Sequence, residues 1–534
     1  MNRCLSNLIF FFTLPLVTSP LLFFGKEFQF LWIYVLYALF IMVEPIPLVA
    51  TALLPLFLLP ICAITTARQT AMAYFFDATP FVLTCFILAL AVEETGLHRR
   101  VALTMMRFAG SKKRNILIAN TLSTTFISMF ITDLPVLTVV ISVVYEISRT
   151  LIEAQNKCSS NSSSSSLLEL KLFEEKIDLS KLSKEDANFC KAMMFCGPVA
   201  AVIGGRITLP GSVMNFIIKD VIKVFYRDLD YISYSTWLLM SLPAAPLQLL
   251  VTVIVVTIWF LGPKELLCYQ KKNEGEEAEQ GEMLKEVIRG QYLQLGRISF
   301  AEGSVMFLML VCVAAWFFRC PDFMHGWSEL LPDNGSFVTD TTVSIMVCIL
   351  FFVWPKTLKC DDWAPILTLE NMAKLPWAVI LLVGSTFAIT EGIKDSGFVN
   401  MLACAMTEFL KATSPVLLQL LAMAISMFDC GGANMIWTPI FLGIANQIPV
   451  HPFYFSLPIV FTAGSQFVLP NSIVVLIVLQ TKVLTIKDLI IPGGLIQLIF
   501  AAITLLQFNT WAYWLLDLQV VPEANGLQLN CSHG

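Results

Sequence analysis

The sequence predicts an all-α polytopic membrane protein, and three observations support this class: its composition, its recurring apolar runs and two matching pairs of interrupted segments. Of 534 residues, 57% are hydrophobic and only 14% are charged, and the mean hydropathy is +0.75. About a quarter of the residues in an ordinary soluble domain are charged, so this composition excludes that class. The net charge of −5 is mild and the basic residues form no stripe, which gives no reason to expect a nucleic acid partner.

Apolar runs that suit a hydrocarbon layer about 30 Å thick recur throughout the chain. The predicted spans are Leu8–Phe24, Phe30–Val43, Ile46–Ile64, Pro80–Val92, Ile116–Ile131, Trp237–Leu261, Val305–Phe318, Val343–Trp354, Trp377–Ile389 and Leu484–Leu506. A cleaved signal peptide is not expected, because further spans rather than a small-residue cleavage site follow the first run.

Short basic loops set the predicted orientation, because Lys and Arg accumulate on the cytoplasmic side of a membrane. Residues 98–114, the polar insert Gln155–Cys190 and the charged segment 264–298 are predicted to be cytoplasmic loops. The stretch Ile116–Thr150 therefore returns to the side it left, and we expect a re-entrant hairpin with Asp133 near its tip. The N-terminus is expected in the cytoplasm and the C-terminus outside the cell.

Two glycosylation sequons fit this orientation. Asn334-Gly-Ser lies in the predicted outer loop 319–341, and Asn530-Cys-Ser lies in the C-terminal tail. Both asparagines are predicted to carry glycans. Asn161-Ser-Ser matches the same pattern, but its predicted cytoplasmic position excludes it.

Two pairs of polar breaks inside apolar segments echo each other. The first pair is Phe130–Val140 and Ile203–Asn215, and the second is Met427–Phe441 and Phe461–Val475. A bilayer offers no water to satisfy backbone groups, so interrupted helices persist only where they are buried in protein or line a polar cavity. Such breaks in corresponding positions of two halves indicate a binding site near the middle of the membrane, as in transporters.

The spacing of the breaks supports an internal repeat. Asp133 precedes Pro210 by 77 residues, whereas Asp429 precedes Pro470 by 41. The difference of 36 residues (77 − 41) equals the length of the insert Gln155–Cys190. Shared identity is limited to a Leu-Pro-x-Ser element in the second break of each half.

Four ionisable residues in the apolar segments are functional candidates: Glu44, Asp133, Arg206 and Asp429. Each is costly inside a membrane, roughly 2.5–3.5 kcal/mol at a helix centre on the insertion scale. A carboxylate among broken helix ends could coordinate sodium together with unwound carbonyls, or it could carry a proton if burial favours its neutral form. The alternative is that Arg206 only neutralises one or both acids. Glu44, at the end of a span, is expected to be structural.

Amides and hydroxyls accompany the breaks: Asn215, Asn434, Asn471, Thr208, Ser212, Thr438 and Ser472. Helix N-termini with N–H groups and hydroxyls suit an anionic substrate group. Helix capping is the alternative for each residue alone.

The cysteine and histidine patterns suggest neither a metal site nor a cofactor. Fourteen cysteines are scattered, most of them within apolar spans, where a thiol behaves as a small hydrophobic group. The four histidines are far apart, with no metal-ligand spacing. With no paired nucleophile and base and no nucleotide-binding loop, we do not expect an enzyme.

Several sequence blocks fall in the order of a known family: EPIPLVATALLPL, AVEETGLHRRVAL, FCKAMMFC, LGRISFAE, KLPWAVILLVG and NTWAYWLLDL. On these blocks the chain resembles, over nearly its whole length, the divalent anion/sodium symporter family (solute carrier family 13), closest to its citrate and dicarboxylate branch. The resemblance implies a sodium-coupled secondary transporter of di- or tricarboxylates such as succinate or citrate. It also implies a homodimer, with a scaffold and an elevator-type transport domain of two inverted repeats, each containing a re-entrant hairpin and an interrupted helix. We expect the protein in the plasma membrane, with an internal membrane as the alternative.

The same resemblance assigns the binding residues. The family carries Ser-Asn-Thr at each hairpin tip, where this chain has degenerate motifs. The expected substrate-binding residues are Thr132, Asp133, Leu134, Asp429, Cys430, Gly431 and Asn434. The expected ion-binding residues are Asp133, Gly204, Gly205, Arg206, Thr208, Gly211, Ser212, Asn215, Pro470 and Asn471.

Arg206 stands where the family usually has a small polar residue. A fixed guanidinium could do the electrostatic work of a bound sodium ion. However, Asp133 and Asp429 together outweigh its single positive charge and would repel a dianion. The alternatives to sodium coupling are therefore a sodium-independent exchanger or a proton-coupled carrier that uses these three residues, or a transport-dead family member that acts as a scaffold or sensor.

The predicted organisation has five parts. They are N-terminal, mainly scaffold spans (1–110), a first transport repeat (111–235, with the insert 155–190), scaffold spans (236–375), a second transport repeat (376–483), and a last span with an extracellular tail (484–534).

Overall fold

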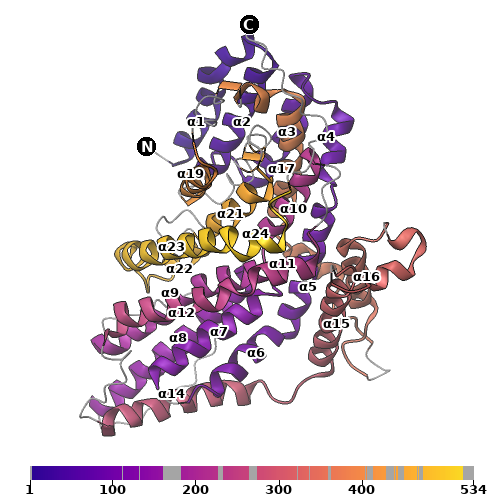
Figure 1. Cartoon of the computed structure of the whole chain (residues 1–534). Helices are drawn as coiled ribbons and strands as arrows, with labels where there is room; N and C mark the ends of the chain where they lie inside the picture. Colours follow the sequence, from indigo (N-terminus) through magenta and orange to yellow (C-terminus); the bar gives the residue numbers. More distant parts are fainter. Residues whose placement is uncertain are drawn as a thin grey trace.

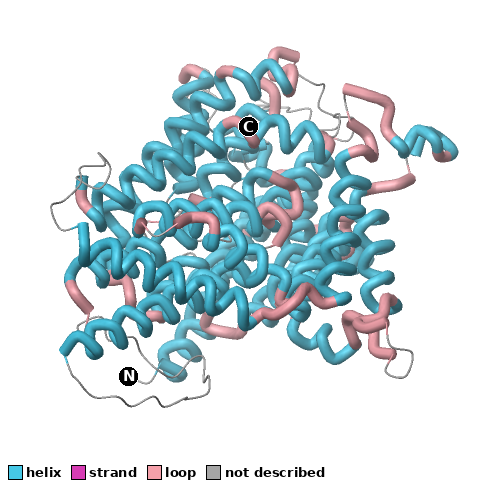
Figure 2. The backbone as a smooth tube through the Cα atoms, turned by 90° about the horizontal axis from the view of Figure 1, so that it is seen from below, coloured by secondary structure: helices cyan, strands magenta, loops and turns pink. Residues whose placement is uncertain are grey.

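The computed structural model is helical throughout the part of the chain that it describes. That part comprises residues 3–110, 112–131, 133–159, 182–226, 232–263, 274–321, 323–335, 337–358, 363–402, 404–405, 413–427, 438, 441–442, 445, 450–465, 467 and 473–520. In it, an isolated β-bridge joins Pro355 and Pro365. Short loops connect the helices (Figure 2).

The N-terminal helices form the upper part of Figure 1. They are α1 (Arg3–Thr18), η1 (Ser19–Phe23), α2 (Lys26–Val43), α3 (Leu48–Ile61) and α4 (Ala67–Tyr74). Glu44 ends α2 in the left-handed conformation, with φ of 49°.

Helix α17 (Trp377–Asp395) packs among these N-terminal helices, against α3 and α4 in particular. A Cβ atom at Gly384 would lie 2.8 Å from the carbonyl oxygen of Tyr74, so a glycine permits the close approach to α4. The hydroxyls of Tyr37 on α2 and Ser385 on α17 lie 2.5 Å apart. Helix α17 falls within the range predicted for the second transport repeat, but it packs mainly on the N-terminal helices, with a smaller contact to α10 (Val213–Phe225).

A second group surrounds α5 (Ala78–Thr95), on which α15 and α16 pack. Its members are α6 (Leu97–Arg107), α14 (Glu274–Gln294), α15 (Phe300–Phe317), η4 (Trp327–Leu330), η5 (Pro332–Gly335), α16 (Asp340–Val353) and η6 (Leu369–Lys374). Helix α14 lies within the segment expected to be a charged loop and packs on α6.

The remaining helices contain the two halves with breaks. The first half comprises α7 (Lys113–Ser128), α8 (Asp133–Ser159), α9 (Lys184–Ile207) and α10 (Val213–Phe225), followed by α11 (Tyr234–Ser241), α12 (Ala244–Val256) and the π-turn η3 (Thr257–Leu261). The second half comprises α19 (Pro415–Met427), α21 (Phe453–Ala463), α22 (Ile473–Gln480), α23 (Ile486–Asn509) and α24 (Trp511–Leu515).

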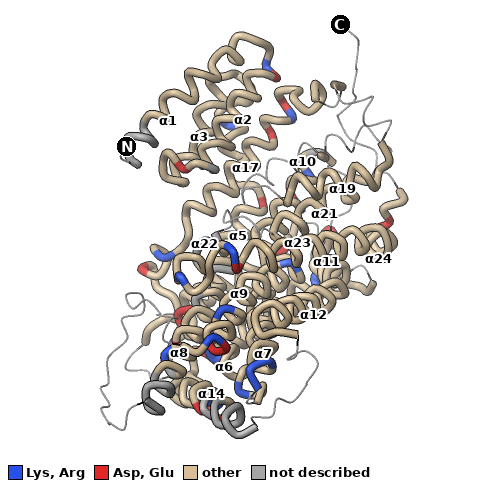
Figure 3. Tube along the Cα trace, turned by 90° about the vertical axis from the view of Figure 1, so that its left-hand side faces the viewer, with Lys and Arg blue, Asp and Glu red and all other residues tan. Residues whose placement is uncertain are grey.

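Helices overlap each of the ten predicted spans, although Trp237–Leu261 is divided between α11, α12 and η3. Within the described residues, six helical stretches are long and apolar enough to cross a membrane. Charged residues gather mainly around α6, α7, α8 and α9, while long stretches of the other helices carry few (Figure 3). The buried thiols of Cys85, Cys190, Cys196 and Cys312 are free, as expected of small apolar groups, whereas Cys404 is disulfide-bonded.

A buried ion pair fixes α6 to the start of α15. Arg100 Nε lies 2.9 Å from Glu302 Oε1, and both side chains are less than a tenth exposed. The guanidinium also donates to the carbonyls of Leu295 and Gly296, and Glu302 caps α15 through Ser299. This pair connects two helices that are separated by about 200 residues in sequence.

We expect Glu302→Gln to lower the thermal unfolding midpoint in detergent by several degrees. Removing one partner leaves the buried Arg100 charge without its carboxylate, and breaking such a pair costs about 3–5 kcal/mol. Lys285→Gln is the matched control, because Lys285 and Glu282 form an exposed pair whose loss costs about 1 kcal/mol or less. Equal midpoints for the two variants would contradict this role for Arg100 and Glu302.

Candidate functional site

The hairpin of α7 and α8 packs its turn against α9. Helix α7 ends at Ser128, and α8 begins at Asp133. The hydroxyl of Thr125 donates to the carbonyl of Ala200 at 3.1 Å, and that of Ser128 donates to Ala201 at 2.7 Å. Both bonds use hydroxyls of the first arm to hold it on the last two turns of α9.

Two glycines allow the backbones to approach at this point. A Cβ atom on Gly204 would lie 2.2 Å from the carbonyl oxygen of Thr125, and one on Gly211 would lie 2.8 Å from that of Gly205. Real Cβ atoms essentially never come this close to another heavy atom. The predicted ion-binding residues Gly204 and Gly211 thus have a packing role, and any role in holding an ion remains a prediction.

The predicted break in the first half is present. Helix α9 ends at Ile207, residues Thr208 and Ser212 have extended backbones, and α10 starts at Val213. The side-chain amide of Asn215 donates to the carbonyls of Gly205 and Thr208, each at 2.8 Å. Asn215 is 1% exposed, so its amide satisfies two carbonyls that the unwound helix leaves without their usual partners.

Thr208 ties the break to the hairpin, since its hydroxyl donates to the carbonyl of Met129 in the hairpin turn. The structure therefore brings Gly204, Gly205, Thr208, Gly211 and Asn215 together at the break, while their role in binding an ion stays a prediction. Ser212 precedes the first turn of α10, but its side chain makes no capping hydrogen bond to that helix.

Arg206 connects the two halves of the chain. Its side chain is buried, and Nη2 donates to Ser465 Oγ at 2.6 Å. Ser465 follows α21 at the start of the second-half break, and it is also buried. The arginine carbonyl accepts a hydrogen bond of 3.0 Å from the indole of Trp237, whose ring lies 5.7 Å from that of Phe461 on α21. The two predicted breaks meet at this guanidinium.

The second half repeats part of this arrangement. Helix α21 ends at Ala463 and α22 begins at Ile473, and both ends lie within the predicted break Phe461–Val475. The hydroxyls of Ser426 and Thr462 lie 2.5 Å apart and hold the end of α19 to the end of α21, much as Ser128 holds α7 to α9. In addition, Gln497 on α23 donates to the carbonyl of Met427 at 3.0 Å.

Several predicted residues fall outside the part of the chain that the structure describes: Thr132, Asp429, Cys430, Gly431, Asn434, Pro470, Asn471, Ser472 and Asn530. Asp133 and Leu134 begin α8 and Asn334 belongs to η5, but the described part does not extend to their side chains. The expected pairing of Arg206 with Asp133 or Asp429 therefore stays a prediction. Thr438 is described and is 4% exposed.

Sequence reasoning missed four residues that shape the site: Ser128, Trp237, Ser426 and Ser465. Each serine lies within a few residues of a helix end, with Ser128 and Ser426 beside a predicted break and Ser465 inside one, and this position was an available signal. Trp237 had only been read as the start of an apolar span.

The arrangement places a permanent positive charge among buried hydroxyls and backbone carbonyls. A guanidinium offers a planar fork of donors to a carboxylate, and carbonyls of an unwound helix suit a hard cation. The described residues contain no group of three or more His, Cys, Asp or Glu side chains that could hold a metal ion. A guanidinium of this kind is chemically suited to an anion, and the nearby oxygen atoms are of the kind that contact an alkali cation.

Comparison with known proteins gives one family and a consistent set of relatives. Residues 2–518 match the sodium:sulfate symporter transmembrane region. The sodium-dependent high-affinity dicarboxylate transporter 2 of Caenorhabditis elegans is 30% identical over 95% of this chain and 94% of its own length. The Na(+)/citrate cotransporter of Rattus norvegicus is 27% identical over 98% of both chains.

A solved structure supports the fold alone. MtrF of Neisseria gonorrhoeae, described as illuminating a class of antimetabolite efflux pumps, superposes with a TM-score of 0.54 at 11% identity. The superposition covers 94% of this chain and 97% of that one.

We expect Gly204→Ala to lower the thermal midpoint and the yield of folded protein. The added methyl group meets the Thr125 carbonyl, and overpacking of this kind costs about 1–3 kcal/mol. Gly303→Ala on α15 is the control, because nothing lies within 4 Å of its added Cβ and alanine favours a helix. A normal midpoint for Gly204→Ala in detergent would show that the hairpin does not pack on α9 in this way.

Proposed function

The chain belongs to the sodium:sulfate symporter family, and on this premise we propose that it is a sodium-coupled secondary transporter of small organic anions. We infer that its substrates are di- or tricarboxylates of the succinate and citrate kind. The observation that carries this proposal is the similarity, over nearly the full length, to relatives named as dicarboxylate and citrate transporters.

The site geometry supports an anionic substrate. Arg206 is buried at the meeting point of the two breaks, and its guanidinium can form charge-assisted hydrogen bonds with a substrate carboxylate. The carbonyls of Gly205 and Thr208, now held by Asn215, are oxygen atoms that could also contact sodium. Sodium bound beside the substrate would offset the repulsion between a dianion and the acids of the site, which explains why cation coupling suits this chain.

We propose that the moving unit comprises the two halves with breaks, and that it works in a homodimer in the plasma membrane. We assign α17 to the scaffold, because it packs on α3 and α4. The cytoplasmic N-terminus, the extracellular C-terminus and the glycans on Asn334 and Asn530 belong to the same proposal. No further cofactor is included in it.

Arg206 also motivates a second candidate. Because its side chain bonds to Ser465, a fixed positive charge already joins the two breaks and could replace a coupling ion. The second candidate is therefore sodium-independent exchange, with proton coupling through Asp133 or Asp429 as a variant of it. The third possibility is a scaffold or sensor without transport activity.

Uptake of labelled succinate, citrate, sulfate and glutamate into cells that express the protein distinguishes these candidates. We expect uptake of succinate or citrate to fall to background when choline replaces sodium, because the coupling ion supplies the driving force. Measurement at two pH values distinguishes proton coupling from sodium coupling and from sodium-independent exchange. Uptake that persists without sodium would favour the second candidate, and no uptake in any condition would favour the scaffold.

We expect Arg206→Gln to raise the KM for the dicarboxylate by roughly 10–100-fold, since a hydrogen bond to a charged group contributes about 1.5–3 kcal/mol. Arg99→Gln is the matched control, because Arg99 is an exposed arginine on α6. Surface biotinylation checks that both variants reach the membrane. An unchanged KM for Arg206→Gln would mean that the guanidinium only connects α9 to the second half.

A further inference from the structure

Helix α10 carries a site residue and a buried charge on consecutive turns. Asn215 lies in its first turn and closes the break in the first half, and Lys219 follows four residues later. Both side chains are less than a tenth exposed. Any displacement of Lys219 along the helix axis therefore displaces Asn215 by the same amount.

Lys219 binds to a helix outside the two halves that contain the breaks. Its Nζ lies 2.8 Å from Asp340 Oδ2, and both side chains are 5% exposed. The other oxygen of Asp340 receives a bond of 2.7 Å from Arg319 Nε, and its backbone carbonyl accepts from the indole of Trp316. Asp340 begins α16, so α15 and α16 hold it in place independently of Lys219.

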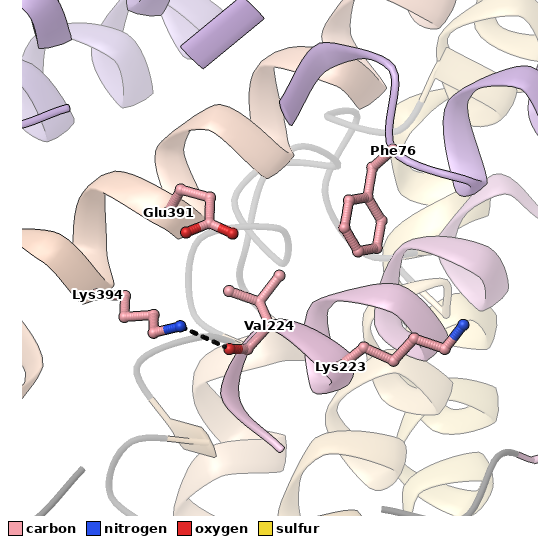
Figure 4. Close-up of a pocket in the computed structure, with 5 residues that line it drawn as sticks. All are labelled: Phe76, Lys223, Val224, Glu391 and Lys394. Carbon is pink, nitrogen blue, oxygen red and sulfur yellow. Dashed lines mark hydrogen bonds between the residues drawn. The ribbon is translucent and has the colours of Figure 1, made fainter. Parts of the chain in front are cut away.

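Two further contacts bind α10 to its surroundings. The rings of Phe216 on α10 and Phe81 on α5 have centroids 3.9 Å apart. Near the end of α10, Lys394 on α17 donates to the carbonyl of Val224 at 3.2 Å (Figure 4). A cavity of about 240 Å³, lined by Phe76, Lys223, Val224, Glu391 and Lys394, lies beside this contact. The interface between α10 and α17 is therefore only partly packed.

Charged residues on α10 and those around α5, α15 and α16 balance each other only when the two groups of helices are in contact. On α10, Lys219, Asp220 and Lys223 sum to +1 (+1 − 1 + 1), and Asp220 pairs with Lys223 at 3.4 Å.

Opposite α10, Asp77, Arg319 and Asp340 sum to −1 (−1 + 1 − 1). Asp77 lines the same small pocket as Lys219 and Asp220. Separation of the two sides would thus leave one uncompensated charge on each, in a place where burial makes charge costly.

We propose that the Lys219–Asp340 ion pair is a latch that holds α10 on the scaffold helices. The pair is formed in the conformation described here and breaks in each transport cycle. Lys219 is in this sense a positioning residue, because it acts on the site through the helix that carries Asn215. The inference rests on the proposed transport function, in which the halves with breaks move against α5, α15, α16 and α17.

Of the two substitutions that break the pair, the one at Lys219 is expected to leave a folded protein. Lys219→Met removes one partner of Asp340 but leaves the Arg319–Asp340 bond, so no acid is stranded. Asp340→Asn would instead leave two buried cations, Lys219 and Arg319, without their carboxylate, so the test uses Lys219→Met. Lys191→Met is the matched control, because the Lys191–Asp488 pair joins α9 to α23 and touches neither α10 nor the scaffold helices named above.

The experiment introduces Phe81→Cys and Phe216→Cys together and joins them with a short bifunctional methanethiosulfonate reagent. The crosslink ties α10 to α5, and dithiothreitol reverses it. We expect crosslinking to stop sodium-dependent succinate uptake and dithiothreitol to restore it, because the scaffold contact can then no longer open. The wild type and each single cysteine variant, treated in the same way, control for the native cysteines.

The second readout requires no transport. In purified protein, we expect Lys219→Met to slow crosslinking of the cysteine pair several-fold while Lys191→Met leaves it unchanged, since the weakened latch lowers the population of the closed state. A crosslinked protein that transports normally would overturn the proposal, and so would an unchanged crosslinking rate in Lys219→Met. If the wild type takes up no substrate while Lys219→Met still slows crosslinking several-fold, the proposed function fails, and the ion pair stands as a contact that holds α10 on the scaffold helices.

Discussion

The structure depends on one constraint: inside a bilayer every backbone group needs a partner from the protein itself. The interruption between α9 and α10 removes helical partners from several carbonyls, and Asn215 replaces two of them with a single side chain. The hydroxyl of Thr208 in turn donates a hydrogen bond to the carbonyl of Met129 in the hairpin turn. These bonds give the carbonyls of Gly205 and Thr208 partners within the protein, and they tie the break to the hairpin beside it.

Arg206 connects the break in the first half to the second half of the chain. Its contact with Ser465 gives the first break a partner in the second, and Trp237 holds its backbone from a third direction. A buried cation of this kind is stable only with several partners around it. In the proposed function, the same guanidinium that helps assemble the site also recognises an anion.

The sequence predicted the spans and the position of the first break, because apolar length and interrupted hydropathy are local signals. It also singled out Gly204, Gly205, Thr208, Gly211 and Asn215, which the structure places around that break. It could not predict the partners across the interface. Lys219 occurs in an amphipathic stretch with no visible mate, and Asp340 had been assigned to an outer loop. Their pairing depends on tertiary packing between segments 121 residues apart. Helix α14 was missed for another reason, since its charge suggested a loop, and α17 was grouped by chain order rather than by the helices it contacts.

The double hydrogen bond of Asn215 has a consequence for the chemical ageing of the protein. Loss of ammonia from the amide would turn the side chain into a carboxylate, which keeps the shape but has no N–H to offer the carbonyls of Gly205 and Thr208. Two attractions would become two repulsions through the exchange of a few atoms. The reaction needs the following backbone nitrogen to attack the amide, and the helical conformation that starts at Val213, together with the bulky Phe216 that follows Asn215, holds that nitrogen away. The fold that positions this asparagine thus also preserves it over the lifetime of the molecule.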